Sequence, residues 1–203
     1  LHDALPIYLS LQYGLVPESS YGYSAYATVV GPIYGDYQLA YQFASLALKI
    51  TEKFNNLALK ATITMTACNN LMLWREHIKH FENLNAEGYK AGLESGNFQH
   101  SGYLLMFRLF NSFDRGKFLE DIMTNLPGYL SFCRETKNEV TVDIILSLQL
   151  SLSNLLAITP DKLSFDNEEL SEEQFLLACQ ENRSSIALCK YHTLKSQIGR
   201  AHV

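Results

Sequence analysis

The chain's nearest approach to a metal-binding motif is the stretch HIKH, in which His77 and His80 follow directly after Glu76. Two imidazoles three residues apart share one face of a helix and could ligate the same zinc ion. A structural zinc needs four ligands, however, and no cysteine or third histidine lies close in the sequence; His100 would have to reach the pair through the tertiary fold. We therefore interpret both histidines as solvated or helix-packing residues and predict no metal site.

The motifs of other catalytic and ligand-binding sites are also absent. The chain contains no GxxxxGKS or GxxxxGKT loop to cradle phosphates, and no HRD or DFG motif of a protein kinase. The acidic run at residues 168–173 lacks the alternating oxygen ligands and the glycine of an EF-hand loop, so we interpret it as a solvated helix start. The sequence thus predicts no catalytic, cofactor-binding or metal-ligating residue, and no cofactor.

The composition is that of an ordinary globular protein: of 203 residues, 47% are hydrophobic and 18% are charged, with a net charge of −5. That charge argues against nucleic-acid binding, which depends on a basic patch. No apolar run approaches the ~20 residues of a membrane span, so no membrane insertion is expected. The cysteines form no CxxC pair, and we expect small buried residues in a reducing, cytoplasmic compartment; they are Cys68, Cys133, Cys179 and Cys189.

The two ends differ from the rest of the chain. Residues 1–7 read LHDALPI and residues 198–203 read IGRAHV; both match translated sequencing adaptors, each in the orientation expected at its end. We therefore expect both segments to be artefacts, to be excluded from fold reasoning as tags are. The natural sequence is then residues 8–197, an internal piece of a longer protein. The alternative is that both termini are genuine.

Helical periodicity dominates the chain, and its clearest part is GDYQLAYQFASLAL at residues 35–48. An aspartate after glycine is suited to cap a helix over residues 37–53, and a preceding helix is expected over residues 18–30. This pair resembles a tetratricopeptide repeat, in which a Gly-Asp-aromatic turn precedes a helix with small residues where the helices cross. The residues at the repeat positions are Gly35, Asp36, Tyr37, Ala40, Ala44 and Ala47, with Ala44 in place of the usual aromatic.

One helix pair cannot bury its apolar face alone, so further copies of the pattern are expected. Weaker copies do follow in the sequence. Further helices are predicted over residues 57–73, 74–94, 103–113, 117–135, 140–156, 172–179 and 182–195. Gly96 and Gly116 mark turns, and Phe118 after Gly116 echoes Tyr37 after Gly35, 81 residues earlier. Each hairpin would therefore occupy about 40 residues, longer than a strict tetratricopeptide repeat.

Two residues in this series carry separate expectations. Trp74 is expected to begin a helix and to join two hairpins, and Pro127 is expected to kink or break its helix because proline lacks the backbone donor. No convincing strand alternation occurs. The sequence predicts an all-α fold: a tetratricopeptide-like α-solenoid of about nine helices in antiparallel pairs, with right-handed superhelical character.

The ordered set of motifs resembles one family, the helical repeat region of very large bacterial signalling proteins. The stretches are LSLQYGLVPESSYGYSAYA at 9–27, WREH at 74–77, GYKAGLESGN at 88–97, GY at 102–103 and DRGKFLED at 114–121. The resemblance implies a parent polypeptide with several domains in order along it: a serine/threonine kinase-like domain, an AAA-type predicted ATPase, this helical region, a GAF domain and a sensor histidine kinase. The resemblance covers essentially all of residues 8–197. It implies that the parent is an ATP-binding kinase of the two-component type. It also implies that this fragment carries neither the kinase nor the ATPase activity.

Two functions follow from this reading. The first is a non-catalytic scaffold and regulatory segment in signal transduction, whose partners are the flanking domains of the same polypeptide and a possible further protein or peptide. The alternative is a solenoid that senses a small molecule or peptide for an ATPase-coupled regulator. A deep pocket with converging polar groups would favour the sensor, and a shallow groove would favour the scaffold.

Overall fold

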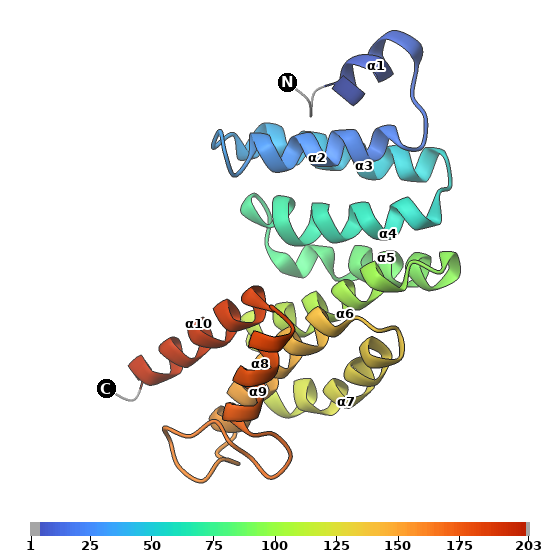
Figure 1. The fold of residues 1–203 in the computed structure, drawn as a ribbon. Coiled ribbons are helices and arrows are strands. Elements are labelled where there is room, and N and C mark those ends of the chain that lie inside the picture. The colour runs from blue at the N-terminus through green and yellow to red at the C-terminus, as the bar shows by residue number, and fades with distance from the viewer. Residues whose placement is uncertain (1–4, 202–203) are drawn as a thin grey trace. The chain divides into compact units, whose positions relative to one another are not determined.

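The computed structural model describes residues 5–201 (Figure 1). Within that range the chain forms ten α-helices and no strand, which confirms the all-helical fold class; the sequence had predicted about nine helices. No helix among the described residues is both long and apolar enough to cross a membrane. The chain divides into two compact units, unit 1 (Leu1–Arg108) and unit 2 (Leu109–Val203), and each is described by itself.

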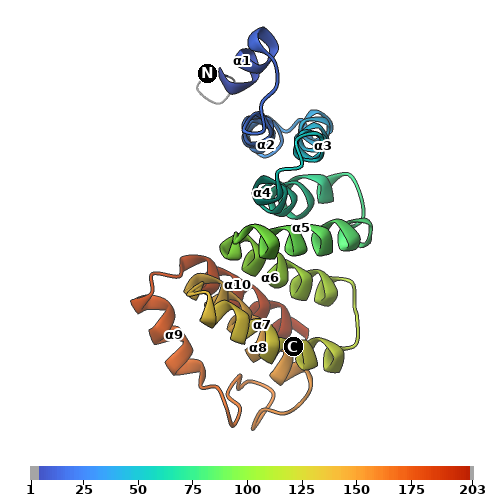
Figure 2. The ribbon, with the colours of Figure 1, turned by 90° about the vertical axis from the view of Figure 1, so that its right-hand side faces the viewer.

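Unit 1 is a succession of helices, each packed on the one before. They are α1 (Leu5–Tyr13), α2 (Ser19–Val30), α3 (Tyr37–Lys53), α4 (Leu57–Thr66), α5 (Glu82–Ser95) and the first part of α6 (Phe98–Asp114). Contacts join α1 to α2, α2 to α3, α3 to α4 and α4 to α5. Figure 2 looks along α2 and α3 and shows them side by side, with α4 beneath. Helix α1 was not predicted; its first three residues, 5–7, lie in the segment that was excluded from fold reasoning as an expected adaptor artefact.

The α2–α3 pair forms as the sequence predicts. The Asp36 carboxylate caps α3 by accepting a hydrogen bond from the Leu39 amide at 2.9 Å. Gly35 adopts the left-handed conformation, with φ of 75°, at the turn before it. At the crossing the helices approach so closely that a Cβ on Gly31 would lie 3.0 Å from the Ala40 Cβ. The helices can meet at this distance because their contact surfaces carry so little side chain.

The α4–α5 pair uses the same device with different residues. A Cβ on Gly88 would lie 2.7 Å from Thr64 Cγ2, and one on Gly92 would lie 3.2 Å from the Ala61 Cβ and 2.2 Å from Ser101 Oγ. Two glycines four residues apart on α5 therefore let its backbone lie against α4 and the start of α6. Gly96 then ends α5 in the left-handed conformation, with φ of 75°, as a glycine C-cap.

Three helix boundaries in unit 1 differ from the sequence prediction. Helix α6 begins at Phe98 rather than at residue 103, directly after the Gly96 turn. Helix α4 ends at Thr66 and α5 begins only at Glu82, so the helices predicted over residues 57–73 and 74–94 are both wrong in this region. The segment between α4 and α5 is held in an irregular form by side-chain contacts with α3, which local propensity does not register.

Unit 2 is arranged around one central helix. Its elements are the last residues of α6, then α7 (Leu119–Glu135), α8 (Glu139–Leu155), α9 (Glu172–Glu181) and α10 (Ser185–Ala201). Helix α8 contacts α7, α9 and α10, and from Thr141 to Asn154 almost all of its side chains are buried. A helix that is apolar on every side is expected to be surrounded in this way. Its neighbours cover it from several directions, instead of one pairing partner only.

Two features of α7 differ from the sequence prediction. Pro127 does not break the helix, which continues from Leu119 to Glu135. Only one backbone hydrogen bond is lost at a proline, and four buried side chains hold the helix through this point: Ile122, Leu126, Leu130 and Cys133. Phe118 is also not the equivalent of Tyr37, because it is the N-cap residue of α7 and is 78% exposed, whereas Tyr37 is the first residue of α3. Gly116 does form the expected left-handed turn, with φ of 66°.

The last two helices are joined to α8 by a buried carboxylate. Asp143 is only 4% exposed, and it accepts hydrogen bonds from Asn182 Nδ2 at 3.2 Å and from the Ser184 hydroxyl. These donors come from the turn between α9 and α10, where Arg183 has a φ of 53°. Helix α10 therefore begins at Ser185, three residues later than predicted. Ser171 caps α9 as expected, with Gln174 N as the donor.

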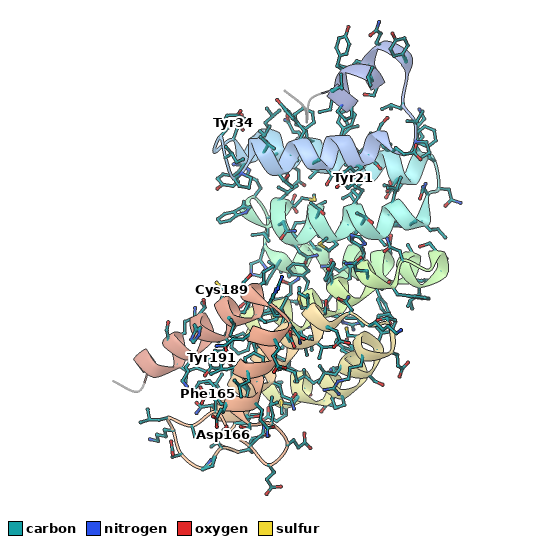
Figure 3. All side chains as sticks on the ribbon, viewed as in Figure 1. Tyr21, Tyr34, Phe165, Asp166, Cys189 and Tyr191 are labelled. Atoms are coloured by element: carbon teal, nitrogen blue, oxygen red, sulfur yellow. The ribbon has the colours of Figure 1, made fainter. Side chains whose placement is uncertain are left out.

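A second cluster in unit 2 surrounds Lys195. Its ammonium group bonds to the Glu172 carboxylate and to the Tyr191 hydroxyl at 2.9 Å, and lies 5.0 Å from the centre of the Phe165 ring. The rings of Phe165 and Tyr191, both labelled in Figure 3, meet edge to face with centroids 6.1 Å apart. The cluster fixes the long connection between α8 and α9 against α10.

Candidate functional site

The predicted repeat positions on α3 fall into two groups. Ala40, Ala44 and Ala47 are all buried, on the face that packs within unit 1. Asp36 and Gly35 are exposed and shape the turn into the helix. Gly96 and Gly116 likewise serve turns, with open space around the position a Cβ would take. These residues position helices, and none of them presents a reactive group.

The most unusual backbone in unit 1 lies between α4 and α5. We call residues 67–81 the strap. It consists of a π-helical turn at Ala67–Leu71, a 3₁₀ turn at Met72–Trp74, and a second 3₁₀ turn at Ile78–Phe81. Residues 75–77 separate the last two turns, and His77 among them is extended, with ψ of 136°. A π-helical insertion of this kind frequently accompanies a functional site.

Trp74 ends the second of these turns, so the expectation that it begins a helix is wrong. Its indole ring lies against the ring of Tyr37 on α3, with centroids 5.1 Å apart and an interplanar angle of 30°. The indole N–H donates to the Asn70 carbonyl at 3.2 Å. Trp74 thus joins the second hairpin to the first, as expected, yet 58% of it remains exposed. A fixed, exposed aromatic ring of this kind is typical of interaction sites.

One turn further along α3, a second contact holds the strap. The Tyr41 hydroxyl donates to Glu76 Oε1, and His80 Nδ1 lies 3.3 Å from Glu76 Oε2. The Tyr41 hydrogen bond, followed by the His80 contact, lowers the pKa of the Glu76 carboxyl. The same hydrogen bond is the main reason that the pKa of Tyr41 is raised. Glu76 is therefore held as an anion between a phenol and an imidazole.

Two asparagines anchor the strap on its other side. Asn69 and Asn85, both buried, exchange side-chain hydrogen bonds: Asn69 Nδ2 to Asn85 Oδ1 at 2.8 Å, and Asn85 Nδ2 to Asn69 Oδ1 at 3.2 Å. A reciprocal pair satisfies both amides without water. It fixes the π-helical turn against α5. Phe81, 2% exposed, adds an apolar anchor in the core of unit 1.

The strap offers recognition chemistry and no assembled catalytic set. It presents an aromatic face, a carboxylate and two imidazoles, but Glu76 and His80 are engaged with each other and with Tyr41. His77 caps the turn at residue 78 by accepting a hydrogen bond from the Lys79 amide. Across residues 5–201 no three His, Cys, Asp or Glu side chains gather closely enough to hold a metal ion.

The cysteines follow the sequence prediction with one exception. Cys68, Cys133 and Cys179 are buried, and burial raises the pKa of the Cys68 thiol to about 12 and of the other two to about 11. Such thiols stay protonated and are poor nucleophiles. Cys189 is exposed, contrary to expectation, because it lies on the outer side of α10. The tyrosines are also divided: Tyr23 is buried, whereas Tyr21 and Tyr34 stand in solvent (Figure 3).

Unit 2 contains two hollows beside the acidic run. One, of about 310 Å³, is lined by Asp166, Glu172, Glu173, Leu176, Leu177 and Gln180. The other, of about 380 Å³, is lined by Met123, Gln149, Ile158, Asn167, Glu168 and Glu169. Asp166 accepts a hydrogen bond from the Glu172 amide, and Asn167 accepts from Glu169 and Leu170. The side chains of Asp166 and Asn167, which precede the acidic run, therefore organise the backbone of the run.

Sequence reasoning missed the strap's partners and the glycine pair of α5. Glycines four residues apart at 88 and 92 were visible as a helix-crossing signal, and could have been used to set the α4–α5 register. The links from Tyr41 to Glu76 and from Asn69 to Asn85 span 35 and 16 residues, and no local pattern announces them.

No protein-family model, curated protein or solved structure matches this chain.

Proposed function

We propose that this chain is a non-catalytic helical-repeat segment, with a scaffold and regulatory role, in a multidomain ATPase–sensor kinase of signal transduction. The observation that carries the proposal is the succession α2, α3, α4, α5 in unit 1, in which each helix packs on the one before. Nearest-neighbour packing of this kind is how repeat proteins build long surfaces and link distant ends. The resemblance of the ordered motifs to the helical region of large bacterial signalling proteins supplies the parent.

The seams between these helices support a tetratricopeptide-like arrangement. Both pairs cross at small residues, Gly31 with Ala40 in one and Gly88 with Thr64 in the other. Glycines in the left-handed conformation stand at the turns before α3 and after α5. We propose that units of this kind continue into a solenoid whose first partners are the flanking domains of the same cytoplasmic polypeptide.

The test of the non-catalytic part uses the purified chain. Phosphoryl transfer needs a phosphate-cradling loop, a lysine, metal-binding carboxylates and a positioned base, and the sequence shows no such set. Titration calorimetry with Mg-ATP is expected to show no saturable binding, and incubation with labelled ATP no transfer of phosphate. Tight, saturable ATP binding would overturn the proposal.

The alternative, a solenoid that senses a small molecule or peptide, draws on one observation: Trp74 is exposed and lies against the ring of Tyr37. Because Trp74 is the only tryptophan, its fluorescence reports on this surface alone. Saturable quenching of Trp74 fluorescence by a peptide or metabolite pool would favour the sensor over the scaffold. Trp74→Phe should abolish the fluorescence signal itself, and Tyr37→Ala should abolish the quenching because binding is lost.

A further inference from the structure

The break between α4 and α5 has no cause in the local sequence. Residues 57–87 contain neither glycine nor proline, the two residues that ordinarily interrupt a helix. Helix α5 begins at Glu82, and its N-cap residue Phe81 makes no side-chain capping bond. The 3₁₀ turn Ile78–Phe81 runs directly into α5. Helical structure is therefore continuous from Ile78, and only residues 75–77 interrupt it on the other side.

The interruption coincides with the contacts to α3. Glu76, in its middle, is held by Tyr41, and Trp74, at its edge, lies on Tyr37. Tyr37 and Tyr41 occupy successive turns of one face of α3, so they grip the strap at two neighbouring points. The local sequence does not explain why residues 75–77 leave the helix. These two contacts, together with the His77 cap, do explain it.

We propose that the strap is a two-position element. In the closed position, seen here, Trp74 and Glu76 are held on α3. In the open position residues 74–77 join the helical run as an additional turn of α5, and Trp74 and Glu76 leave Tyr37 and Tyr41. The buried anchors Phe81 and Asn69–Asn85 lie outside the moving turn and are common to both positions.

Physical chemistry favours two discrete positions over gradual loosening. Residues 74–77, Trp-Arg-Glu-His, are all compatible with a helix. In an added turn their carbonyls can accept hydrogen bonds from the amides of residues 78–81, in exchange for the bonds that the Arg75 and Glu76 amides now make to the Met72 carbonyl, both at 3.0 Å. The closed position offsets this gain with a hydrogen bond to a charged carboxylate and an aromatic contact. Arg75, Lys79 and His77 are exposed in the strap, and the charge nearest to Glu76 is that of His80 when protonated. A partner that takes Trp74 away from Tyr37 would bias the strap toward the open position.

The regulatory role of the strap rests on the proposed function, because a regulatory segment requires an element with two positions. The existence of the two positions does not depend on that function. The positions themselves can be tested in the isolated chain. A negative result there would leave the scaffold proposal standing, whereas ATP binding by the chain would remove the scaffold proposal and leave the strap.

The experiment compares Tyr41→Phe with the matched control Tyr23→Phe by NMR. Each variant removes one phenolic hydroxyl that is hydrogen-bonded within unit 1, Tyr41 to Glu76 and Tyr23 to Ser10 at 3.0 Å. Loss of a hydrogen bond to a charged group is expected to move the closed–open equilibrium by about tenfold or more toward the open position. The reporter is the Cα resonance of His77, which is extended in the closed position.

In Tyr41→Phe the His77 Cα resonance is expected to move toward its helical value, and acrylamide quenching of Trp74 fluorescence to change with it. Tyr23→Phe should leave both unchanged. Glu76→Gln, which keeps an acceptor oxygen for Tyr41, should give a smaller shift in the same direction. The proposal is overturned if His77 does not move, if it moves to a random-coil value, or if the control moves it equally.

Discussion

Units 1 and 2 differ in the residues at which their helices cross, although both cores also contain large buried apolar side chains. In unit 1 the helices meet at residues with little or no side chain: Ala27, Ala40, Ala44, Ala47, Ala61, Gly88 and Gly92. In unit 2 a single helix, α8, fills the centre with large apolar side chains: Val142, Ile144, Ile145, Leu148, Leu150 and Leu152. The first arrangement depends on how closely two backbones can approach, and the second on how completely a volume is filled.

The difference indicates what each unit tolerates. Adding volume to a small-residue seam separates two helices, whereas removing volume from α8 leaves a cavity among residues that cannot all relax into it. Unit 1 should therefore be most sensitive to added side-chain atoms, and unit 2 to deleted ones. Four predictions test this contrast, in order of decreasing effect.

The largest effect is expected from Leu148→Ala in α8. Leu148 is fully buried, and truncation of a buried leucine costs about 2–5 kcal/mol through lost burial and the cavity left behind. The free energy of unfolding, measured in urea, should fall accordingly. Leu155→Ala on the same helix is the control, because Leu155 is 41% exposed and its loss should change stability little. Equal effects at the two positions would show that α8 is not the centre of unit 2.

The second effect comes from adding atoms to the α2–α3 seam. Ala47→Phe or Ala40→Leu places a large side chain where these alanines are completely buried, and overpacking costs about 1–3 kcal/mol. Both variants should lower the melting temperature. Leu46→Phe, at a neighbouring position that is 39% exposed, should not. A neutral result at both alanines would show that this face of α3 is not the packing face.

The third effect compares the two helix caps. Asp36→Ala removes the acceptor for the Leu39 amide at 2.9 Å and should cost about 1 kcal/mol, with Asp36→Asn close to neutral. Ser171→Ala should cost less, because its bond to the Gln174 amide is longer, at 3.5 Å. Urea unfolding of the four proteins checks the order. A larger loss at Ser171 than at Asp36 would contradict it.

The smallest effect is the pH dependence that the Tyr41–Glu76 contact gives to the stability of unit 1. The pKa of Glu76 is lowered on folding, so its contribution is present above the ordinary glutamate pKa of about 4.3 and is lost as pH falls through the lowered value. The pKa of Tyr41 is raised, so its contribution is present below about pH 10 and is lost as pH rises through the raised value. Tyr41→Phe should flatten both limbs of the stability–pH curve relative to the parent chain. Unchanged limbs would show that the Tyr41–Glu76 contact does not form in solution.

Sequence reasoning succeeded where structure is decided locally. The cap at Asp36, the glycine turn at Gly35 and the buried alanines of α3 each follow from a residue and its immediate neighbours. It failed where contacts distant in sequence decide the backbone. The strap leaves the helix because Tyr41, 35 residues earlier, holds Glu76, and neither side chain signals this in its own neighbourhood.

Two further misses have the same origin. Pro127 was expected to kink or break its helix, but α7 continues through it, because buried neighbours such as Leu126 and Leu130 offset the loss of one hydrogen bond. Phe118 matched Tyr37 by its distance from a glycine, although the helix after Gly116 begins one residue later than the helix after Gly35. A shift of one residue turns a helix position through about 100°, so the two aromatics have different surroundings.

In the proposed function, this chain links the flanking domains of a multidomain kinase through packed helices and carries no catalytic group. The most direct measurement replaces residues 8–197 in the parent polypeptide with a flexible linker of equal reach. Kinase output is then recorded in the ATP-bound and ADP-bound states of the upstream ATPase. The account predicts that output no longer follows the nucleotide state. If output follows the nucleotide state as before, the segment is a passive spacer and the account is wrong.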